Sequence, residues 1–263
     1  MFTKFIVPAA VAAGLALSVG CGRDQASHGF MPSDLLASRL KLSAEQKQAI
    51  QGAFKRHRPT LAARMEALVQ ARNTAMDAAL DPAVSQEAWR IQQEQVAIAV
   101  KAMAMEVRST YQEALPILTE SQKAEGKALL KKIHAHMEGM HGRHHDLAFA
   151  FVKNRLELTD AQAATIQTLV SHRKPTLEAK RDALHKAMAA ALEAGLDPAV
   201  SQAVLDQRFA AAQEAGLALS SEVRAAYLEV VPQLTPDQRE AAKVLVKDFR
   251  NAVDGIRKLA LGF

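Results

Sequence analysis

The chain contains few of the residues that support disulfide bonding, nucleophilic chemistry or aromatic stacking. Its 263 residues include one cysteine, one tryptophan and two tyrosines, and aromatic residues make up only 5% of the total. One cysteine cannot close a disulfide within the chain, so the fold must be stabilised by burial of side chains. With so few aromatic groups, and only 33 Lys and Arg against 28 Asp and Glu, the composition does not predict a nucleic-acid binder.

Sequence signatures of catalysis are also missing. There is no G-x-S-x-G nucleophile motif, no glycine-rich phosphate loop and no H-E-x-x-H zinc motif. We therefore expect a binding protein that requires no cofactor, and not an enzyme.

The N-terminus has the pattern of an export signal. A short basic start, Met1 to Lys4, precedes an apolar run from Phe5 to Val19 that is interrupted by Pro8 and Gly14. At about 15 residues this run is shorter than the roughly 20 residues of a transmembrane helix, which favours a secretory signal. The sequence therefore predicts export to the periplasm.

The only cysteine, Cys21, follows this apolar run. The segment Leu17-Ser-Val-Gly20 before it resembles the lipobox of bacterial lipoproteins, in which the cysteine is acylated and attaches the protein to a membrane. Ser18 departs from that pattern, because a large aliphatic residue is expected three positions before the cysteine. Two alternatives remain open, acylation of Cys21 or ordinary cleavage near Gly20.

The remainder of the chain is an internal repeat. Arg39–Gln46 returns as Arg155–Gln162, and Leu80–Gln86 recurs letter for letter as Leu196–Gln202. The offset is constant, because 155 − 39 and 196 − 80 both give 116. Such a unit is longer than the roughly 20–50 residues of a solenoid repeat and has the size of one small domain. We therefore expect a tandem duplication of one domain.

The repeat also sets the expected domain boundaries. In chain order they are a signal segment at 1–21, a flexible N-terminal segment at 22–38, a first helical unit at 39–138, a His/Met/Gly-rich junction at 139–147 and a second helical unit at 148–263.

Apolar residues recur at steps of three and four in both units, which predicts an all-α fold. We expect four helical stretches per unit, at about 43–58, 59–80, 85–115 and 119–137 and again 116 residues later. Pro59 and Pro175 are predicted to kink or restart the first helix, because proline removes a helical hydrogen bond. Asp81-Pro82 and Asp197-Pro198 predict sharp turns.

A Leu-Ser/Thr-x-x-Gln motif opens the first and fourth helical stretch of each unit. Its hydroxyl and amide can form a capping box, in which the hydroxyl accepts from the backbone N–H three residues on and the glutamine reaches back to the cap residue's own N–H. We interpret the hydroxyls as structural caps and not as nucleophiles. The predicted cap residues are Ser43, Gln46, Thr119, Gln122, Thr159, Gln162, Thr235 and Gln238.

Paired motifs of this kind around a helical hairpin, with an arginine-rich second helix and an export signal, resemble the Spy/CpxP family of periplasmic proteins. Ser43 stands where the family has threonine, which preserves the cap chemistry. The resemblance implies an all-helical unit that pairs into a cradle-shaped antiparallel dimer. It also implies an ATP-independent chaperone or envelope-stress modulator, and some relatives bind or sense metals. Two copies on one chain then imply a cradle-like pseudo-dimer of four-helix units.

The same resemblance suggests where unfolded or partly folded envelope proteins would bind as clients. The second predicted helix would contribute mixed cationic and apolar groups to the concave surface, although an ordinary solvated helix face has the same pattern. The candidate client-binding residues are Arg58, Arg64, Met65, Leu68, Arg72, Lys174, Lys180, Arg181 and Leu184.

A His/Met cluster between the two units suggests an alternative function, metal binding or metal sensing in the periplasm. Five of the nine histidines fall in this segment, and the corresponding part of the second unit has none. Imidazole suits Zn, Cu(II) and Ni, and thioether suits Cu(I), although the glycines there also fit a solvated linker. The candidate ligands are His134, His136, Met137, Met140, His141, His144 and His145.

Assembly can also be predicted from the duplication. A tether of about ten residues gives the second unit an effective concentration near millimolar. We therefore expect the two units to pair within one molecule, related by an approximate two-fold axis, and the mature protein to be a monomer at micromolar concentration in light scattering.

Overall fold

The computed structural model describes residues 38–139 and 145–261, with the side chains of 130–139, 145–148, 249 and 252–261 left aside. Every regular element in these ranges is helical, and none is a strand. The fold is all-α, as the apolar spacing predicts. The signal segment, Cys21 and most of the predicted flexible segment at 22–38 lie outside the described residues.

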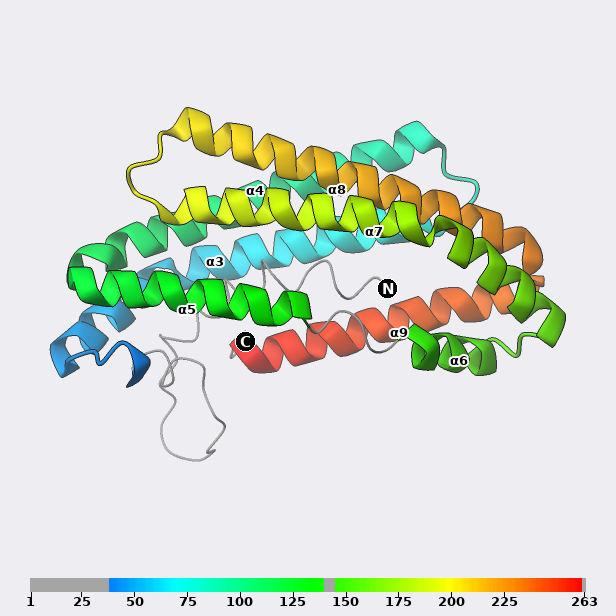
Figure 1. Cartoon of the computed structure of the whole chain (residues 1–263), viewed down its shortest axis with the longest axis horizontal. Coiled ribbons are helices and arrows are strands. Elements are labelled where there is room, and N and C mark those ends of the chain that lie inside the picture. The colour runs from blue at the N-terminus through cyan, green and yellow to red at the C-terminus, as the bar shows by residue number, and fades with distance from the viewer. Residues whose placement is uncertain (1–37, 140–144, 262–263) are drawn as a thin grey trace. The chain divides into compact units, whose positions relative to one another are not determined.

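Seven α-helices and two short 3₁₀ helices make up these described ranges (Figure 1). In the first half, α3 (Ala44–Ala79), α4 (Gln86–Ala114), η2 (Leu115–Ile117) and α5 (Glu120–Gly139) follow one another. In the second half, α6 (His145–Arg155) precedes α7 (Asp160–Leu196), α8 (Gln202–Val230), η4 (Val231–Gln233) and α9 (Pro236–Leu261). The starts of α3 and α7, and both ends of α4 and α8, differ by the 116 residues of the sequence repeat.

The prediction that proline would restart the first helix was wrong. Pro59 lies inside the 36-residue α3, and Pro175 lies inside the 37-residue α7. Proline removes one backbone hydrogen bond and crowds one carbonyl, whereas the helix continues for several turns on either side. Both prolines are exposed, so the carbonyl that loses its partner lies near solvent. Two of the four predicted stretches in each half are therefore one helix.

The turns at the hairpin tips are as predicted. Asp81 Oδ1 accepts a hydrogen bond from Ala83 N at 2.9 Å, and Asp197 Oδ1 accepts one from Ala199 N at 2.9 Å. Each aspartate thus stabilises a turn in which proline blocks continuation of the helix. The hydroxyls of Ser85 and Ser201 then cap the N-termini of α4 and α8.

The contacts divide the chain into two compact units that do not follow the repeat boundary. The first compact unit contains the described parts of 1–64, 103–144 and 250–263. The second compact unit contains 65–102 and the described part of 145–249. The tip of the first hairpin therefore packs with the second half of the sequence.

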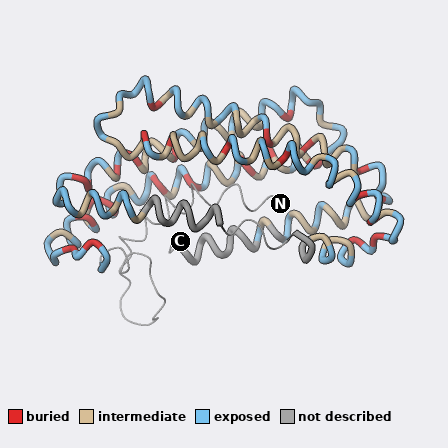
Figure 2. Tube along the Cα trace, viewed as in Figure 1, coloured by how far each residue is buried: buried red, intermediate tan, exposed pale blue. Residues whose placement is uncertain are grey.

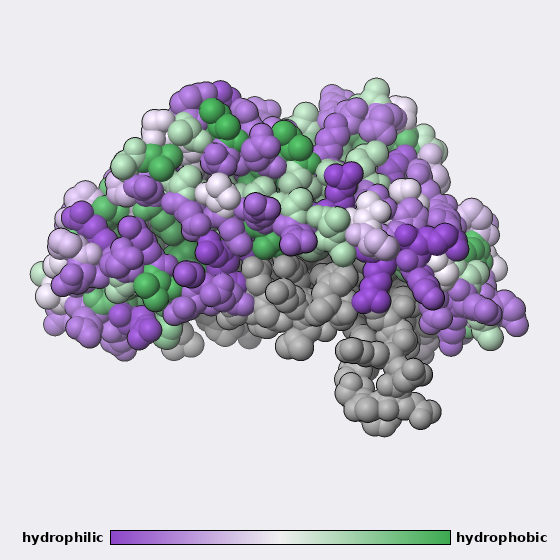
Figure 3. All heavy atoms as spheres, turned by 180° about the vertical axis from the view of Figure 1, so that it is seen from behind, coloured by the Kyte–Doolittle hydropathy of each residue, from purple (hydrophilic) through white to green (hydrophobic). Residues whose placement is uncertain are grey.

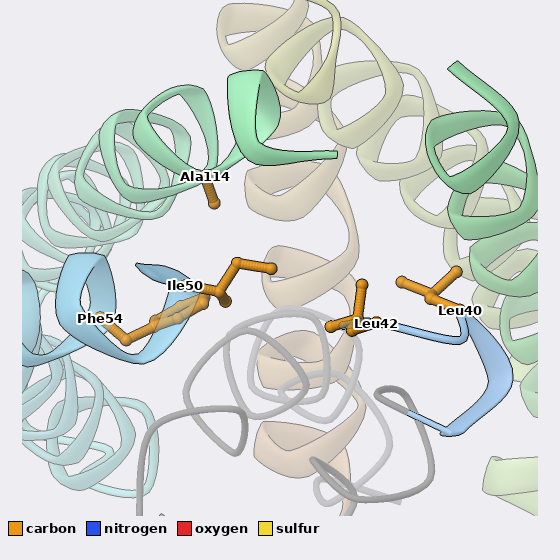
Figure 4. Close-up of a cluster of buried hydrophobic side chains, with 5 residues drawn as sticks. All are labelled: Leu40, Leu42, Ile50, Phe54 and Ala114. Carbon is orange, nitrogen blue, oxygen red and sulfur yellow. The ribbon is translucent and has the colours of Figure 1, made fainter. Parts of the chain in front are cut away.

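A small hydrophobic core closes the base of the hairpin in the first compact unit. Leu40 and Leu42 come from the segment before α3, Ile50 and Phe54 from α3, and Ala114 from the end of α4 (Figure 4). Ile117 and Leu118 pack against this group. Burial of an aliphatic or aromatic side chain of this size contributes about 1.5–3 kcal/mol.

The second compact unit has the matching core, built from Leu156, Leu158, Ala163, Ile166 and Leu234. Its two long helices, α7 and α8, run antiparallel beside each other (Figure 1). Buried positions recur along both helices between exposed ones (Figure 2).

The backbone before each core adopts the same turn. Lys41 and Glu157, which are 116 residues apart, have positive φ angles of 49° and 50°. At the second turn Leu158 N donates to Lys153 O at 3.0 Å and Glu157 N donates to Asn154 O at 3.3 Å. This is the Schellman arrangement that ends a helix with a left-handed residue. The turn directs the chain from α6 into the motif that opens α7.

Candidate functional site

The Leu-Ser/Thr-x-x-Gln motif does more than cap helices. Thr159 Oγ1 accepts from Gln162 N, and Gln162 Oε1 accepts from Thr159 N, which is a complete capping box. The structure has the same pair of hydrogen bonds at Ser43, Thr119 and Thr235 with the glutamines three residues on.

The glutamines then pair with each other across the base of each hairpin. Gln162 Nε2 donates to Gln238 Oε1 at 2.8 Å, and Gln238 Nε2 donates to Gln162 Oε1 at 3.2 Å. The second amide hydrogens donate to backbone carbonyls, from Gln162 to Gln233 O at 2.8 Å and from Gln238 to Glu157 O at 3.2 Å. A primary amide has two donors and two acceptor positions, and here all four are used in each side chain.

The first half forms the same pair from Gln46 and Gln122, with amide contacts of 2.9 and 3.1 Å. Their remaining hydrogens donate to Ile117 O at 2.8 Å and Leu40 O at 3.1 Å. We call each of these pairs a glutamine lock. Each lock joins the start of the first long helix to the start of the last helix in its half.

A second shared feature is a cation held between two glutamates of the neighbouring helix. In the first half, His57 on α3 contacts Glu106 with Nδ1 at 2.7 Å and Glu113 with Nε2 at 2.9 Å. Arg56 also donates to Glu113 through Nε at 2.9 Å. In the second half, Arg173 on α7 bonds Glu222 and Glu229 on α8.

These contacts shift the ionisation of the groups involved. The pKa of His57 is raised above 6.5, chiefly by its hydrogen bond to Glu106. Hydrogen bonds from Arg56 lower the pKa of Glu113, and those from Lys180 lower the pKa of Glu222. The pKa of Arg173 is raised by Glu229 and Glu222, so this guanidinium stays charged at all relevant pH values.

The tip of the first hairpin is fixed to α8 by a buried arginine. Arg224, whose residue is only 3% exposed, donates through Nη1 to Gln86 Oε1 at 2.8 Å and through Nη2 to Val84 O at 2.6 Å. Its guanidinium also lies over the ring of Trp89, 5.5 Å from the centroid. We call this group the Arg224 anchor.

Two further contacts join the first hairpin to α8. Tyr227 Oη donates to Leu80 O at 3.1 Å, and burial raises the pKa of Tyr227. Lys101 Nζ forms an ion pair with Asp206 at 2.8 Å. The sequence patterns indicated no functional role for Arg224, Tyr227 or His57. Glu-Val-Arg and the following tyrosine recur at the same offset, and Tyr227 falls on the apolar stripe of its predicted helix.

The predicted client-binding residues fall into two groups. Met65, Arg72 and Leu184 are buried, and Arg72 also donates to the side chain of Asn73. Lys180 is held by Glu222 and Arg181 by Asp182, while Leu68 is half-buried. The structure leaves three of the predicted cations exposed on α3 and α7, namely Arg58, Arg64 and Lys174.

None of the candidate metal ligands has a described side chain. Met140, His141 and His144 lie outside the described residues, and the side chains of His134, His136, Met137 and His145 are outside the described ones. Within the part of the chain whose side chains are described, no group of three or more His, Cys, Asp or Glu residues could hold a metal ion. In that same part, none of the helices has both the length and the hydropathy needed to span a membrane.

Comparison with known protein families gives a match to part of the chain. Residues 144–246 match the family model described as LTXXQ motif family protein. This part of the chain is similar to the LTXXQ motif family. No curated protein and no solved structure shows significant similarity to it.

The matched segment contains two LTXXQ motifs, Leu158–Gln162 and Leu234–Gln238, which together form one glutamine lock. The motifs at Leu42–Gln46 and Leu118–Gln122 lie outside the match but form the same hydrogen bonds. The glutamine of the LTXXQ motif therefore closes the base of a hairpin.

Proposed function

We propose that this protein is an exported, ATP-independent chaperone-like protein that holds partly unfolded envelope proteins on its long helices. The observation that carries the proposal is the match of residues 144–246 to the LTXXQ family model. The all-helical fold of the described residues and the export-signal pattern expected at residues 1–21 support it. A periplasmic location, with or without acylation of Cys21, is part of the same proposal. So is pairing of the two repeats within one molecule, which the contacts of the first hairpin tip with α8 support.

The surface chemistry supports weak and unselective binding. On the face shown in Figure 3, hydrophilic residues predominate and hydrophobic ones are interspersed among them. Exposed large hydrophobic residues in the described part include Ile91 and Ile98 on α4 and Val204 on α8. Exposed apolar groups among cations can hold an unfolded chain through small apolar contacts and long-range attraction.

An aggregation assay tests this proposal. Purified mature protein at a near-stoichiometric ratio should suppress aggregation of insulin after reduction, without nucleotide. The variant Arg58→Ala, Arg64→Ala, Lys174→Ala should suppress it less well, because it removes the exposed cations of the predicted client surface. The matched control, Lys47→Ala, Lys127→Ala, Arg208→Ala, removes three exposed cations elsewhere and should remain active. No suppression by the unchanged protein at any salt concentration would reject chaperone activity.

Metal binding by the His/Met cluster is a second proposal, which only the sequence supports. Calorimetry with Zn(II), Cu(II), Ni(II) and anaerobic Cu(I) should give binding tighter than micromolar if the cluster is a site. Binding should be lost when its five histidines are replaced by alanine, and the matched control is replacement of His172 and His185 on α7. If binding is weaker than micromolar, or is unchanged when the five histidines are replaced, the cluster is a linker and not a metal site.

A further inference from the structure

His57 occupies a position where only its protonated form fits. Both ring nitrogens contact glutamate oxygens, at 2.7 Å to Glu106 and 2.9 Å to Glu113, and the imidazole is only 17% exposed. An ionised carboxylate can only accept a hydrogen bond. A neutral imidazole donates through one nitrogen and would turn the lone pair of the other towards a carboxylate. The geometry therefore needs an imidazolium.

The second half provides the matching position with a permanent charge. Arg173 reaches Glu222 and Glu229, which are 49 and 56 residues further along the chain. His57 reaches Glu106 and Glu113 across the same separations of 49 and 56 residues. Arginine is not deprotonated in proteins, so this contact is closed at any ordinary pH. At this central position the two halves differ in whether the cation can lose its proton, and around it Arg56 shares Glu113 in the first half while Lys180 donates to Glu222 in the second.

We propose that His57, Glu106 and Glu113 form a proton-dependent clasp between α3 and α4, which opens in the first half at alkaline pH while Arg173 keeps the second half closed. The inference does not depend on the proposed chaperone function. Glu106 and Glu113 face the imidazole from α4, and Arg56 on its own helix shares Glu113. Deprotonation of His57 leaves Arg56 on Glu113 but removes the imidazolium from Glu106.

The sign of the pH dependence follows from the direction of the pKa shift. Since the pKa of His57 in the folded protein lies above the ordinary 6.5, protonation favours the folded state. This contribution is fully present below pH 6.5 and is lost as the pH rises through the raised pKa. The first hairpin should therefore loosen above neutral pH, whereas the second should not.

Two measurements on the unchanged protein test the clasp. In ¹⁵N NMR, His57 should have both ring nitrogens protonated at pH 6 and should titrate with a midpoint above 6.5. Hydrogen exchange, corrected for the intrinsic rate, should become faster between pH 6 and 8.5 in segments 50–61 and 103–114. The equivalent segments 166–177 and 219–230 serve as the internal control. A midpoint at or below 6.5, or equal acceleration in both halves, would overturn the proposal.

Exchanging the two cations gives the reciprocal test. His57→Arg should abolish the pH-dependent exchange in the first half, and Arg173→His should create it in the second. Between pH 6 and 8.5 the thermal midpoint of the unchanged protein should fall by about 2–4 °C more than that of His57→Arg. If the pH dependence persists in a folded His57→Arg protein, other groups cause it and the proposal is overturned.

Discussion

Replacing Arg224 by alanine should cost about 3–5 kcal/mol of unfolding free energy, since buried charged hydrogen bonds are lost and their partners stay desolvated. Arg224 is 3% exposed and supplies donors to Gln86 Oε1 and Val84 O. After truncation, Val84 O and the side chain of Gln86 lose their donor, and Trp89 loses the guanidinium over its ring.

Urea unfolding followed by tryptophan fluorescence is the direct measurement. Trp89 is the only tryptophan in the chain and belongs to the Arg224 anchor, so its emission reports on this position. Arg224→Lys should lose about half as much stability as the alanine variant, because the ammonium keeps the charge but cannot reproduce the planar fork. Arg208→Ala, at an exposed position of the same helix, should change stability by no more than about 0.5 kcal/mol. A loss below about 1 kcal/mol in Arg224→Ala would show that the tip does not depend on the anchor.

The Arg224 anchor also shows what sequence patterns cannot supply. The apolar steps of three and four that include Leu219 and Val223 predict that α8 buries one face, and Leu219 is indeed buried. Nothing in that periodicity reveals that an arginine is buried beside it, because buried arginines are uncommon. Its partners lie 138 and 140 residues away, in a turn of the other half. Only the three-dimensional arrangement brings these groups together.

The capping motifs predicted helix boundaries correctly, whereas Pro59 and Pro175 did not. The capping boxes depend on residues three apart, so the motif alone predicts them. Pro59 and Pro175 indicate helix boundaries when read locally, but both lie within long helices with several turns on either side. The cost of one missing hydrogen bond was overridden by packing of residues such as Leu61 and Leu177 just beyond the prolines, which are 1% and 7% exposed.

The candidate site was only partly accessible from sequence for a related reason. Met65 and Leu184 were selected as client-binding because apolar residues beside cations suggest an amphipathic face. Both are buried, since an apolar residue on a helix faces the core whenever a neighbouring helix covers it. The exposed cations Arg58, Arg64 and Lys174 keep their place in the proposed surface. The difference between His57 and Arg173 is visible in an alignment of the two halves. Its effect on pH dependence follows only from the contacts of His57 with Glu106 and Glu113, which the structure shows.

Replacing both glutamines of the second lock, Gln162→Ala with Gln238→Ala, should cost about 2–4 kcal/mol, because the glutamine half of two capping boxes, the amide pair and two contacts with backbone carbonyls are removed. The orphaned acceptors would be Gln233 O and Glu157 O, and the N–H groups of Thr159 and Thr235 would lose their partners. Urea unfolding should show the loss in the second compact unit. Gln167→Ala, an exposed glutamine on the same helix, is the matched control and should be close to neutral.

The two glutamines should also act as one element, which distinguishes a lock from two separate caps. Either single variant leaves the other glutamine without its partner amide, so each single loss should be more than half of the double loss. A double-mutant cycle should therefore give a coupling free energy of about 0.5–3 kcal/mol. Strictly additive losses would mean that the capping boxes alone stabilise α7 and α9. In that case the amide contacts at 2.8 and 3.2 Å contribute nothing to holding the hairpin base closed.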